Sequence, residues 1–199
     1  MSALPSALRR SAPPSGASPS TSGRATRRIA IVRAAAALVW AGVLVAAVGD
    51  DVPTTATQLP TLVAVLLTAY PLIDVIASLV EGSTAAPRNA AVLRANAALS
   101  ALAVVALGIA TLGGDAGSTL VAFGAWAFVS GAVQLGVALR RRGSGERQLP
   151  MVVSGALSAI AGVTFAASAG QDAAHLANLA GYAAVGAVLY LVWAARTRH

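Results

Sequence analysis

The chain has 199 residues, of which 57% are hydrophobic and only 11% are charged, a composition that indicates a membrane protein and argues against an ordinary soluble domain. It contains no cysteine, which excludes a disulfide framework and a thiolate metal site. The net charge of +7 comes from arginines that flank apolar runs without interleaved stacking aromatics, so we expect no nucleic-acid partner.

Residues 1–27 are rich in Ser, Ala, Pro, Gly and Thr, with scattered arginines. Such a segment buries too little apolar surface to offset the entropy of ordering, so it is predicted to be a disordered cytoplasmic tail. A signal peptide is the alternative. Its charged region would be unusually long, however, and no small-residue cleavage site followed by a soluble domain is present.

Residues 28–199 are predicted to form one membrane domain. About 20 residues at about 1.5 Å per residue cross the ~30 Å hydrocarbon core, and lipid offers no partner to unpaired backbone groups. The runs lack the alternation of barrel strands, so we predict an all-α integral membrane protein with the lipid bilayer as its partner. Six apolar runs reach this length, at about 29–48, 59–80, 90–112, 118–139, 149–169 and 173–195.

The placement of arginine predicts the orientation, because cytoplasmic loops accumulate basic residues. All 14 arginines lie before the first run, after an even-numbered run or just inside the end of a neighbouring helix. The other three connections contain no basic residue but do contain acidic residues, namely Asp50, Asp51, Asp115 and Asp172. We therefore expect a multi-pass protein of the plasma membrane with both termini in the cytoplasm.

Two internal similarities predict three repeated helical hairpins. Tyr70, Trp126 and Tyr182 are spaced by 56 residues, each in an even-numbered run. The sequence ALSALA at 98–103 recurs as ALSAIA at 156–161 in the next odd-numbered run. Hairpins of equal orientation are parallel repeats about an axis along the membrane normal.

The fourth run carries a resemblance to a known family. Its sequence, Phe123-Gly-Ala-Trp126 continuing through Gly131, Gln134 and Gly136 to three arginines, resembles the signature of the HdeD-like acid-resistance membrane proteins. The resemblance covers about residues 30–195 and implies six helices in short repeats, with a role in acid or envelope stress. The second run departs from this pattern at Tyr70-Pro71-Leu-Ile-Asp74.

Asp74 is the sharpest candidate for function, because an ionisable group within a span is costly and usually faces a partner or a water-filled cavity. We predict that Arg94, at a similar depth in the neighbouring helix, pairs with Asp74, with Asn96 and Gln134 nearby. The site is either a proton- or ion-responsive centre or a structural salt bridge between helices. Pro71 predicts a kink beside it, which is either a hinge or a packing feature.

Two further patterns concern helix surfaces. The glycines of the fourth and fifth runs predict close helix packing, inside the protein or against a second copy; they are Gly124, Gly131, Gly136, Gly155 and Gly162. His175, Asn178 and Tyr182 are spaced to form one stripe on the sixth helix at its external end. The stripe is either an acid sensor, since histidine changes charge near neutral pH, or an ordinary interfacial feature.

The inventory of reactive residues predicts no enzyme and no cofactor. The chain has no Cys and only two His, and it lacks metalloprotease, phosphate-loop and dinucleotide motifs. We expect a non-enzymatic protein, with a small transporter or channel subunit built around Asp74 and Arg94 as the alternative. The high content of alanine and arginine also suggests a GC-rich bacterial genome.

Overall fold

The computed structural model describes residues 21–48, 52–85, 87–141 and 148–196. In these ranges the secondary structure is helical, and each of the six helices is long and apolar enough to cross a membrane, as predicted. They are α1 (Thr21–Val48), α2 (Thr61–Thr84), α3 (Pro87–Gly113), α4 (Ala116–Arg141), α5 (Leu149–Ser168) and α6 (Asn178–Arg196).

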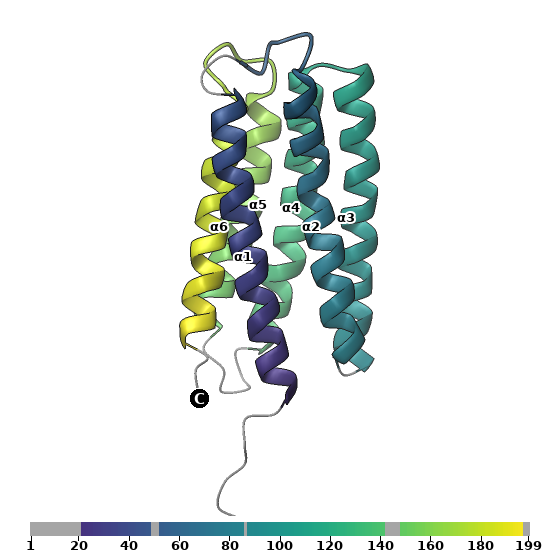
Figure 1. Cartoon of the computed structure of the whole chain (residues 1–199), viewed down its shortest axis with the longest axis vertical. Coiled ribbons are helices and arrows are strands. Elements are labelled where there is room, and N and C mark those ends of the chain that lie inside the picture. The colour runs from purple at the N-terminus through teal and green to yellow at the C-terminus, as the bar shows by residue number, and fades with distance from the viewer. Residues whose placement is uncertain (1–20, 49–51, 86, 142–147, 197–199) are drawn as a thin grey trace, which may run out of the picture.

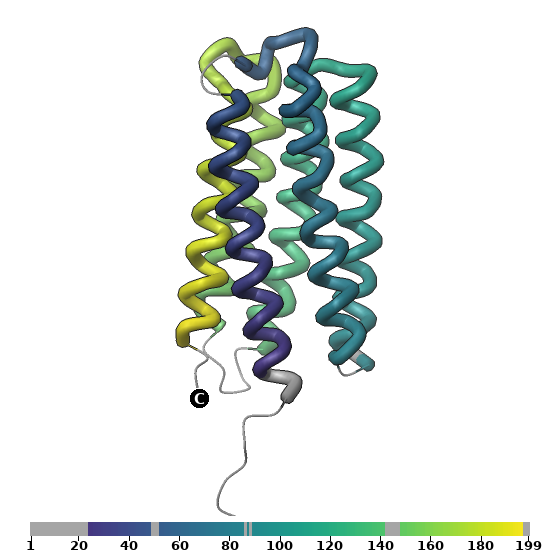
Figure 2. The backbone as a smooth tube through the Cα atoms, in the orientation of Figure 1, coloured from purple at the N-terminus to yellow at the C-terminus, as the bar shows by residue number. Residues whose placement is uncertain are grey.

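The helices stand side by side and alternate in direction (Figure 1). Each contacts the helices before and after it in the chain, and α6 also packs against α1, so the bundle closes into a ring. We call the end where α1 begins and α6 ends the terminal end, at the bottom of Figure 1. The opposite end, where the short loops after α1, α3 and α5 turn, is the distal end (Figure 2).

Two helix boundaries differ from the prediction. Residues 21–27, predicted to belong to the tail, are the first turns of α1, while residues 1–20 lie outside the described chain. The guanidinium Nε of Arg27 donates to the carbonyl of Ala194 at 2.8 Å, which satisfies one of the free carbonyls at the end of α6 and holds the extension in place. The helix α6 begins at Asn178 and not near residue 173, because the preceding residues form a loop.

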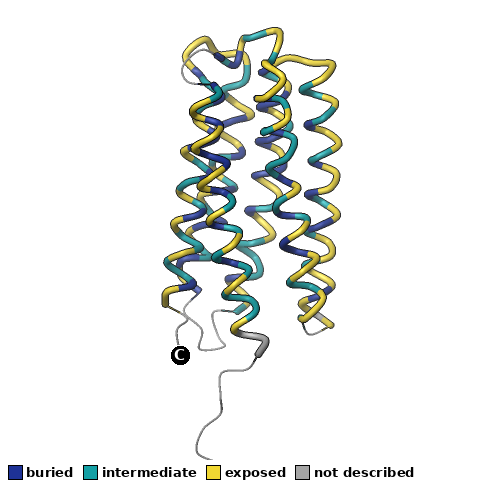
Figure 3. Tube along the Cα trace, viewed as in Figure 1, coloured by how far each residue is buried: buried dark blue, intermediate teal, exposed yellow. Residues whose placement is uncertain are grey.

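Each helix has one buried face and one exposed face along its length. Small or apolar residues of every helix face the interior of the ring, whereas large apolar side chains such as Ile109 and Ile160 are exposed on the outside (Figure 3). An outer surface of this kind is unfavourable in water and suits a lipid environment. The ring is therefore built as a membrane bundle, with a largely apolar outer face.

Glycines bring α4 and α5 into close contact, as their spacing predicted. A Cβ added to Gly131 would lie 2.6 Å from the backbone nitrogen of Ala159, and one added to Gly155 would lie 2.6 Å from that of Leu135. A Cβ added to Gly124 or to Gly162 would likewise lie within 3 Å of the backbone of the opposite helix. Gly136 is different: no atom lies within 4 Å of its added Cβ, so it takes no part in this packing.

The distal end is closed by interlocked loops. The backbone N–H of Thr54, in the loop after α1, donates to the carbonyl of Ala174 at 2.9 Å, and its hydroxyl donates to the carbonyl of Gln171 at 2.8 Å. The N–H of Ala116, at the start of α4, donates to the carbonyl of Ala56 at 2.9 Å. The first loop is thus bonded to the loop after α5 and to the first residue of α4.

Asp115 immediately precedes α4 at this end. Its Oδ1 accepts a bond of 2.6 Å from the N–H of Ser118, and its own N–H donates to the Ser118 hydroxyl at 3.0 Å. Hydrogen bonds to the carboxylate, from the Ser118 backbone N–H first and from the Ser118 side chain second, lower the pKa of Asp115, because they favour the charged form. The reciprocal pair resembles a capping box and fixes where the helix starts.

Candidate functional site

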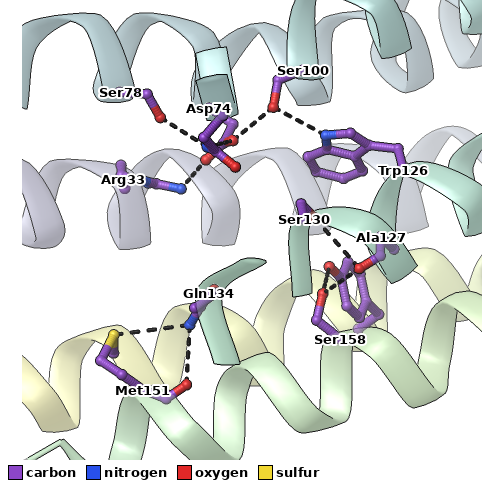
Figure 4. Close-up of polar contacts among 12 residues, drawn as sticks. Arg33, Asp74, Ser78, Ser100, Trp126, Ala127, Ser130, Gln134, Met151 and Ser158 are labelled. Atoms are coloured by element: carbon purple, nitrogen blue, oxygen red, sulfur yellow. Dashed lines mark hydrogen bonds and ion pairs between the residues drawn. The ribbon is translucent and has the colours of Figure 1, made fainter. Parts of the chain in front are cut away.

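A polar network surrounds the carboxylate of Asp74, inside the ring and ten residues before the end of α2 (Figure 4). Its Oδ1 accepts a charge-assisted hydrogen bond from Arg33 Nη2 of α1. Its Oδ2 accepts bonds of 2.6 Å from Asn96 and 2.7 Å from Ser100, both on α3. The buried charge is therefore balanced by a cation and bonded on both oxygens. Asp74 joins α1, α2 and α3 at one point.

The network uses only some of the hydrogen-bond donors of Arg33. Its guanidinium lies 5.0 Å from the ring centroid of Tyr190 on α6, a cation–π distance. A guanidinium carries five N–H donors, and in the described chain the bond to Asp74 is its one hydrogen bond. Arg33 therefore retains N–H groups that can bind a further acceptor.

The predicted partner of Asp74 was wrong. Arg94 is exposed on the outer surface of α3 and forms no ion pair within the described chain, whereas Arg33 occupies the place expected for it. Of the other two candidates, Asn96 contacts Asp74 directly. Gln134, on α4, lines the same cavity as Asp74 but contacts the carbonyl of Met151, at 3.4 Å from its Nε2.

An aromatic cluster lies beside the network, towards the distal end. Phe123, which is 0% exposed, is its centre, with ring centroids 5.3 Å from Trp126, 5.7 Å from Tyr70 and 6.0 Å from Tyr182. Two further rings complete the cluster, those of Trp40 and Phe165. The residues spaced by 56 positions thus meet around one phenylalanine, although they come from three different helices.

Pro71 lies inside α2 next to this cluster. It has no N–H for the carbonyl of Leu67, four residues earlier, and the indole of Trp40 donates to the neighbouring carbonyl of Leu66 at 2.7 Å. A side chain of α1 thus bonds the backbone of α2 beside the proline. This contact gives Pro71 a role in helix packing; whether it is also a hinge stays a hypothesis.

The serines of the two similar segments each bond the aromatic residue of their own hairpin. Ser100 accepts a bond of 3.1 Å from the indole of Trp126. Ser158 donates to the carbonyl of Ala127, so its 2.6 Å contact with the Tyr182 hydroxyl has Tyr182 as donor. In the first hairpin, Trp40 packs against Tyr70 with ring centroids 4.2 Å apart and the planes tilted by 36°. Such parallels are what a repeat predicts, and the descent from one unit stays a hypothesis.

The ring encloses a central cavity of about 580 Å³. Its polar wall includes Arg33, Asp74 and Asn96, and Trp126 and Tyr182 line its inner part. Most of its other lining residues belong to the helix halves nearest the terminal end, among them Glu81 and Arg141. This volume lies within the range of about 300–1,000 Å³ that is usual for a small-molecule site.

Along the axis of the ring the cavity ends at the aromatic cluster. Beyond the aromatic cluster the ring is filled by fully buried aliphatic side chains, and the interlocked loops close it; the aliphatic residues include Leu44, Val63, Leu107, Leu120 and Leu179. The charged side chains that line the cavity, Arg33, Asp74, Glu81 and Arg141, all lie in the terminal half of the ring. The cavity reaches the terminal end at Arg141 and Gln148.

The predicted histidine stripe does not form. His175 lies in the loop before α6, where it pairs with Pro53 in an isolated β-bridge, and Asn178 is the exposed first residue of the helix. Tyr182 points into the ring instead, towards Ser158. The prediction was wrong because it extended the sixth helix through residues that form a loop. Backbone bonds to Val52 and Thr54 fix this loop in a non-helical conformation.

Sequence reasoning missed Arg33, Ser100 and Tyr190. Arg33 is flanked by apolar residues on both sides, which is a signal for a charge inside the membrane. The signal was missed because Arg33 was grouped with the arginines that precede the first run. The ALSALA similarity marked Ser100 as part of a repeat, but not as a hydrogen-bonding group. Nothing in the spacing of Tyr190 pointed to the guanidinium of Arg33.

Comparisons with known proteins give no relative: no family model, no curated protein and no solved structure matches the chain. The resemblance to the HdeD-like family, and the stress role that it implies, stay predictions.

Proposed function

We propose that the protein is a non-enzymatic membrane protein that binds a small anionic molecule in its central cavity, with the anion at Arg33. The observation that carries this proposal is the position of Arg33, whose guanidinium faces a cavity of about 580 Å³ with N–H groups that have no acceptor in the described chain. Guanidinium groups favour carboxylates and phosphates, because their N–H donors match the two oxygens of such a group.

The charge distribution supports an anion. All 14 arginines belong by sequence to the terminal end or to the helix halves next to it, whereas only three of the seven acidic residues do, namely Asp74, Glu81 and Glu146. The resulting positive potential at the open end attracts anions towards the cavity. Asp74 does not oppose binding strongly, since it is already paired with Arg33 and hydrogen-bonded by Asn96 and Ser100.

The aromatic side chains that line the inner part of the cavity favour a ligand with an apolar part. Beyond Arg33 the cavity is lined by Trp126 and Tyr182, and alanine, valine and leucine form much of the apolar part of its remaining walls. A purely polar anion would leave this surface without a partner, whereas an amphiphilic anion places its apolar part against the rings.

The test uses tryptophan fluorescence, because Trp126 lines the cavity and is only 7% exposed. The full chain, reconstituted in phosphatidylcholine nanodiscs, is titrated with ω-bromo-undecanoate, whose bromine quenches a tryptophan that it touches. We expect saturable quenching that is lost in large part in Trp126→Phe. The uncharged ω-bromo-undecanol should bind about tenfold more weakly, which corresponds to one lost charge-assisted bond of about 1.4 kcal/mol.

Arg33 is tested in a background that keeps the cavity neutral. Arg33→Gln combined with Asp74→Asn should remove the preference for the carboxylate over the alcohol, while both probes still quench. Arg94→Gln is the matched control, because Arg94 is exposed outside the ring. Quenching that never saturates and is equal for both probes would show simple partitioning into the bilayer and would overturn the proposal.

A carrier is the second candidate. A binding site near mid-membrane that is open at one end and closed at the other is the arrangement expected of a carrier in one of its two states. Export would require the distal loops to separate, including the bonds of Thr54. Uptake of radiolabelled undecanoate into proteoliposomes against empty liposomes tests this reading, and binding without flux would leave the binding protein as the better description.

A further inference from the structure

We propose that the ligand enters the cavity sideways from the bilayer, between α5 and α6, and that it is a single-chain anionic amphiphile. This inference rests on the proposed binding function and adds the route and the class of ligand.

The first observation is that the cavity reaches the outer surface between these two helices. Five of its eight exposed lining residues lie on these two helices: Leu157, Ile160 and Thr164 on α5, and Gly181 and Val185 on α6. We call these residues the α5–α6 gap. They belong to the same cavity as Arg33, and of all neighbouring pairs in the ring α5 and α6 make the least extensive contact. The wall of the cavity is thus open towards lipid at this place.

The second observation is how the glycines of α6 are used. A Cβ added to Gly181 or Gly186 would meet no atom within 4 Å. Both glycines line the cavity, so they leave space free instead of bringing two helices together. At the α4–α5 contact, by contrast, added Cβ atoms at Gly131 and Gly155 would collide with backbone. Glycines therefore allow α4 and α5 to pack tightly, whereas the glycines of α6 leave space between α5 and α6.

The chemistry of the gap and the cavity identifies the occupant. The gap is apolar except for the Thr164 hydroxyl, which is bonded to the carbonyl of Ile160 in its own helix. An alkyl chain matches this surface and is already present in the bilayer next to it. Inside, Arg33 lies over Tyr190 of α6 and offers N–H donors to an anionic head group. One gap and one set of free donors suit one chain and one anionic head, such as a fatty-acid carboxylate or the phosphate of a lysolipid.

The test fills the gap without touching Arg33. Gly186→Phe and, as a second variant, Gly181→Phe place a ring in the open space, while Gly42→Phe adds the same ring to an exposed glycine of α1 outside the cavity, where an added Cβ also meets no atom within 4 Å. Stopped-flow mixing of ω-bromo-undecanoate with the nanodiscs gives the rate of tryptophan quenching. We expect the two gap variants to slow quenching by at least about tenfold and Gly42→Phe to leave it unchanged.

Iodide supplies the second measurement, because this aqueous anion reaches the cavity from its terminal end. Measured in a Trp193→Phe background, because Trp193 also lines the cavity, its quenching of Trp126 should be the same with and without the gap substitutions, which shows that the cavity is intact. If both gap variants take up the bromo acid as fast as the wild type, the sideways route is wrong and the binding site stands. If the wild type itself shows no saturable quenching, the proposed function fails.

Discussion

The indole of Trp126 on α4 donates a hydrogen bond to the hydroxyl of Ser100 on α3, and that hydroxyl in turn donates to Asp74. One serine therefore connects the aromatic cluster to the ion pair with Arg33. The connection crosses from α4 through α3 to α2, so it also fixes how these three helices lie relative to one another.

Replacing Ser100 by alanine should destabilise the fold. The change leaves the buried indole N–H of Trp126 without an acceptor and removes one of the bonds to Asp74, a loss of about 1–3 kcal/mol for a buried group. Thermal unfolding in detergent, followed by circular dichroism, measures the effect. Ser130→Ala is the matched control, since the Ser130 hydroxyl bonds only a carbonyl of its own helix, at 3.4 Å. Equal melting temperatures for the two variants would contradict the role given to Ser100.

Removing one charge of the Arg33–Asp74 pair should lower the free energy of unfolding more than removing both charges. Asp74→Asn leaves the guanidinium inside the ring without its counter-charge, and we expect a loss of about 3 kcal/mol. Arg33→Gln combined with Asp74→Asn should unfold closer to the wild type, and a double-mutant cycle gives the coupling. Additive effects of the single changes would show that the two residues do not interact. Asp74→Asn combined with Arg94→Gln should show no such recovery, because Arg94 does not contact Asp74.

Adding one methyl group at the α4–α5 contact should destabilise the bundle. Gly131→Ala and Gly155→Ala each place a Cβ within 3 Å of the opposite backbone, which forces the helices apart at a cost of about 1–3 kcal/mol. Gly136→Ala, on the same helix as Gly131, is the control: its Cβ meets open space, and alanine favours a helix over glycine. A loss of stability in Gly136→Ala as large as in Gly131→Ala would argue against backbone contact as the cause.

Accessibility of single cysteines should reveal the orientation. The chain has no native cysteine, so Asp115→Cys and Asp172→Cys at the distal end can be compared directly with Arg140→Cys and Arg196→Cys at the terminal end. The arginine bias predicts that a membrane-impermeant maleimide added to intact cells labels the first two positions and not the last two. The reverse pattern would place the open end of the cavity on the outside of the cell.

The parts of the fold that follow from local sequence were predictable. The six helices depend on the length and apolarity of each run, and the contact between α4 and α5 depends on glycines seven residues apart on each helix. The spacing of Tyr70, Trp126 and Tyr182 even marked the inner wall of the cavity.

The partner of Asp74 was not predictable in this way, because it depends on which helices become neighbours. Depth along the helix made Arg94 a candidate, but it says nothing about which side of α3 that residue occupies, and Arg94 faces outwards. Arg33 became the partner because α1 lies on the other side of α2 in the closed ring. The loop before α6 was missed for a similar reason, since its shape depends on bonds to Thr54, far away in sequence.

The bonds of Thr54 also determine how the ring can change shape. They tie the first hairpin to the last at the distal end, where all three hairpin turns lie. At the terminal end, the bond from Arg27 to the carbonyl of Ala194 links α1 to α6. Within the described chain, three bonds of Thr54 and its neighbours are therefore set against one at the other end, so thermal motion should change the diameter of the ring more at the terminal end than near Phe123.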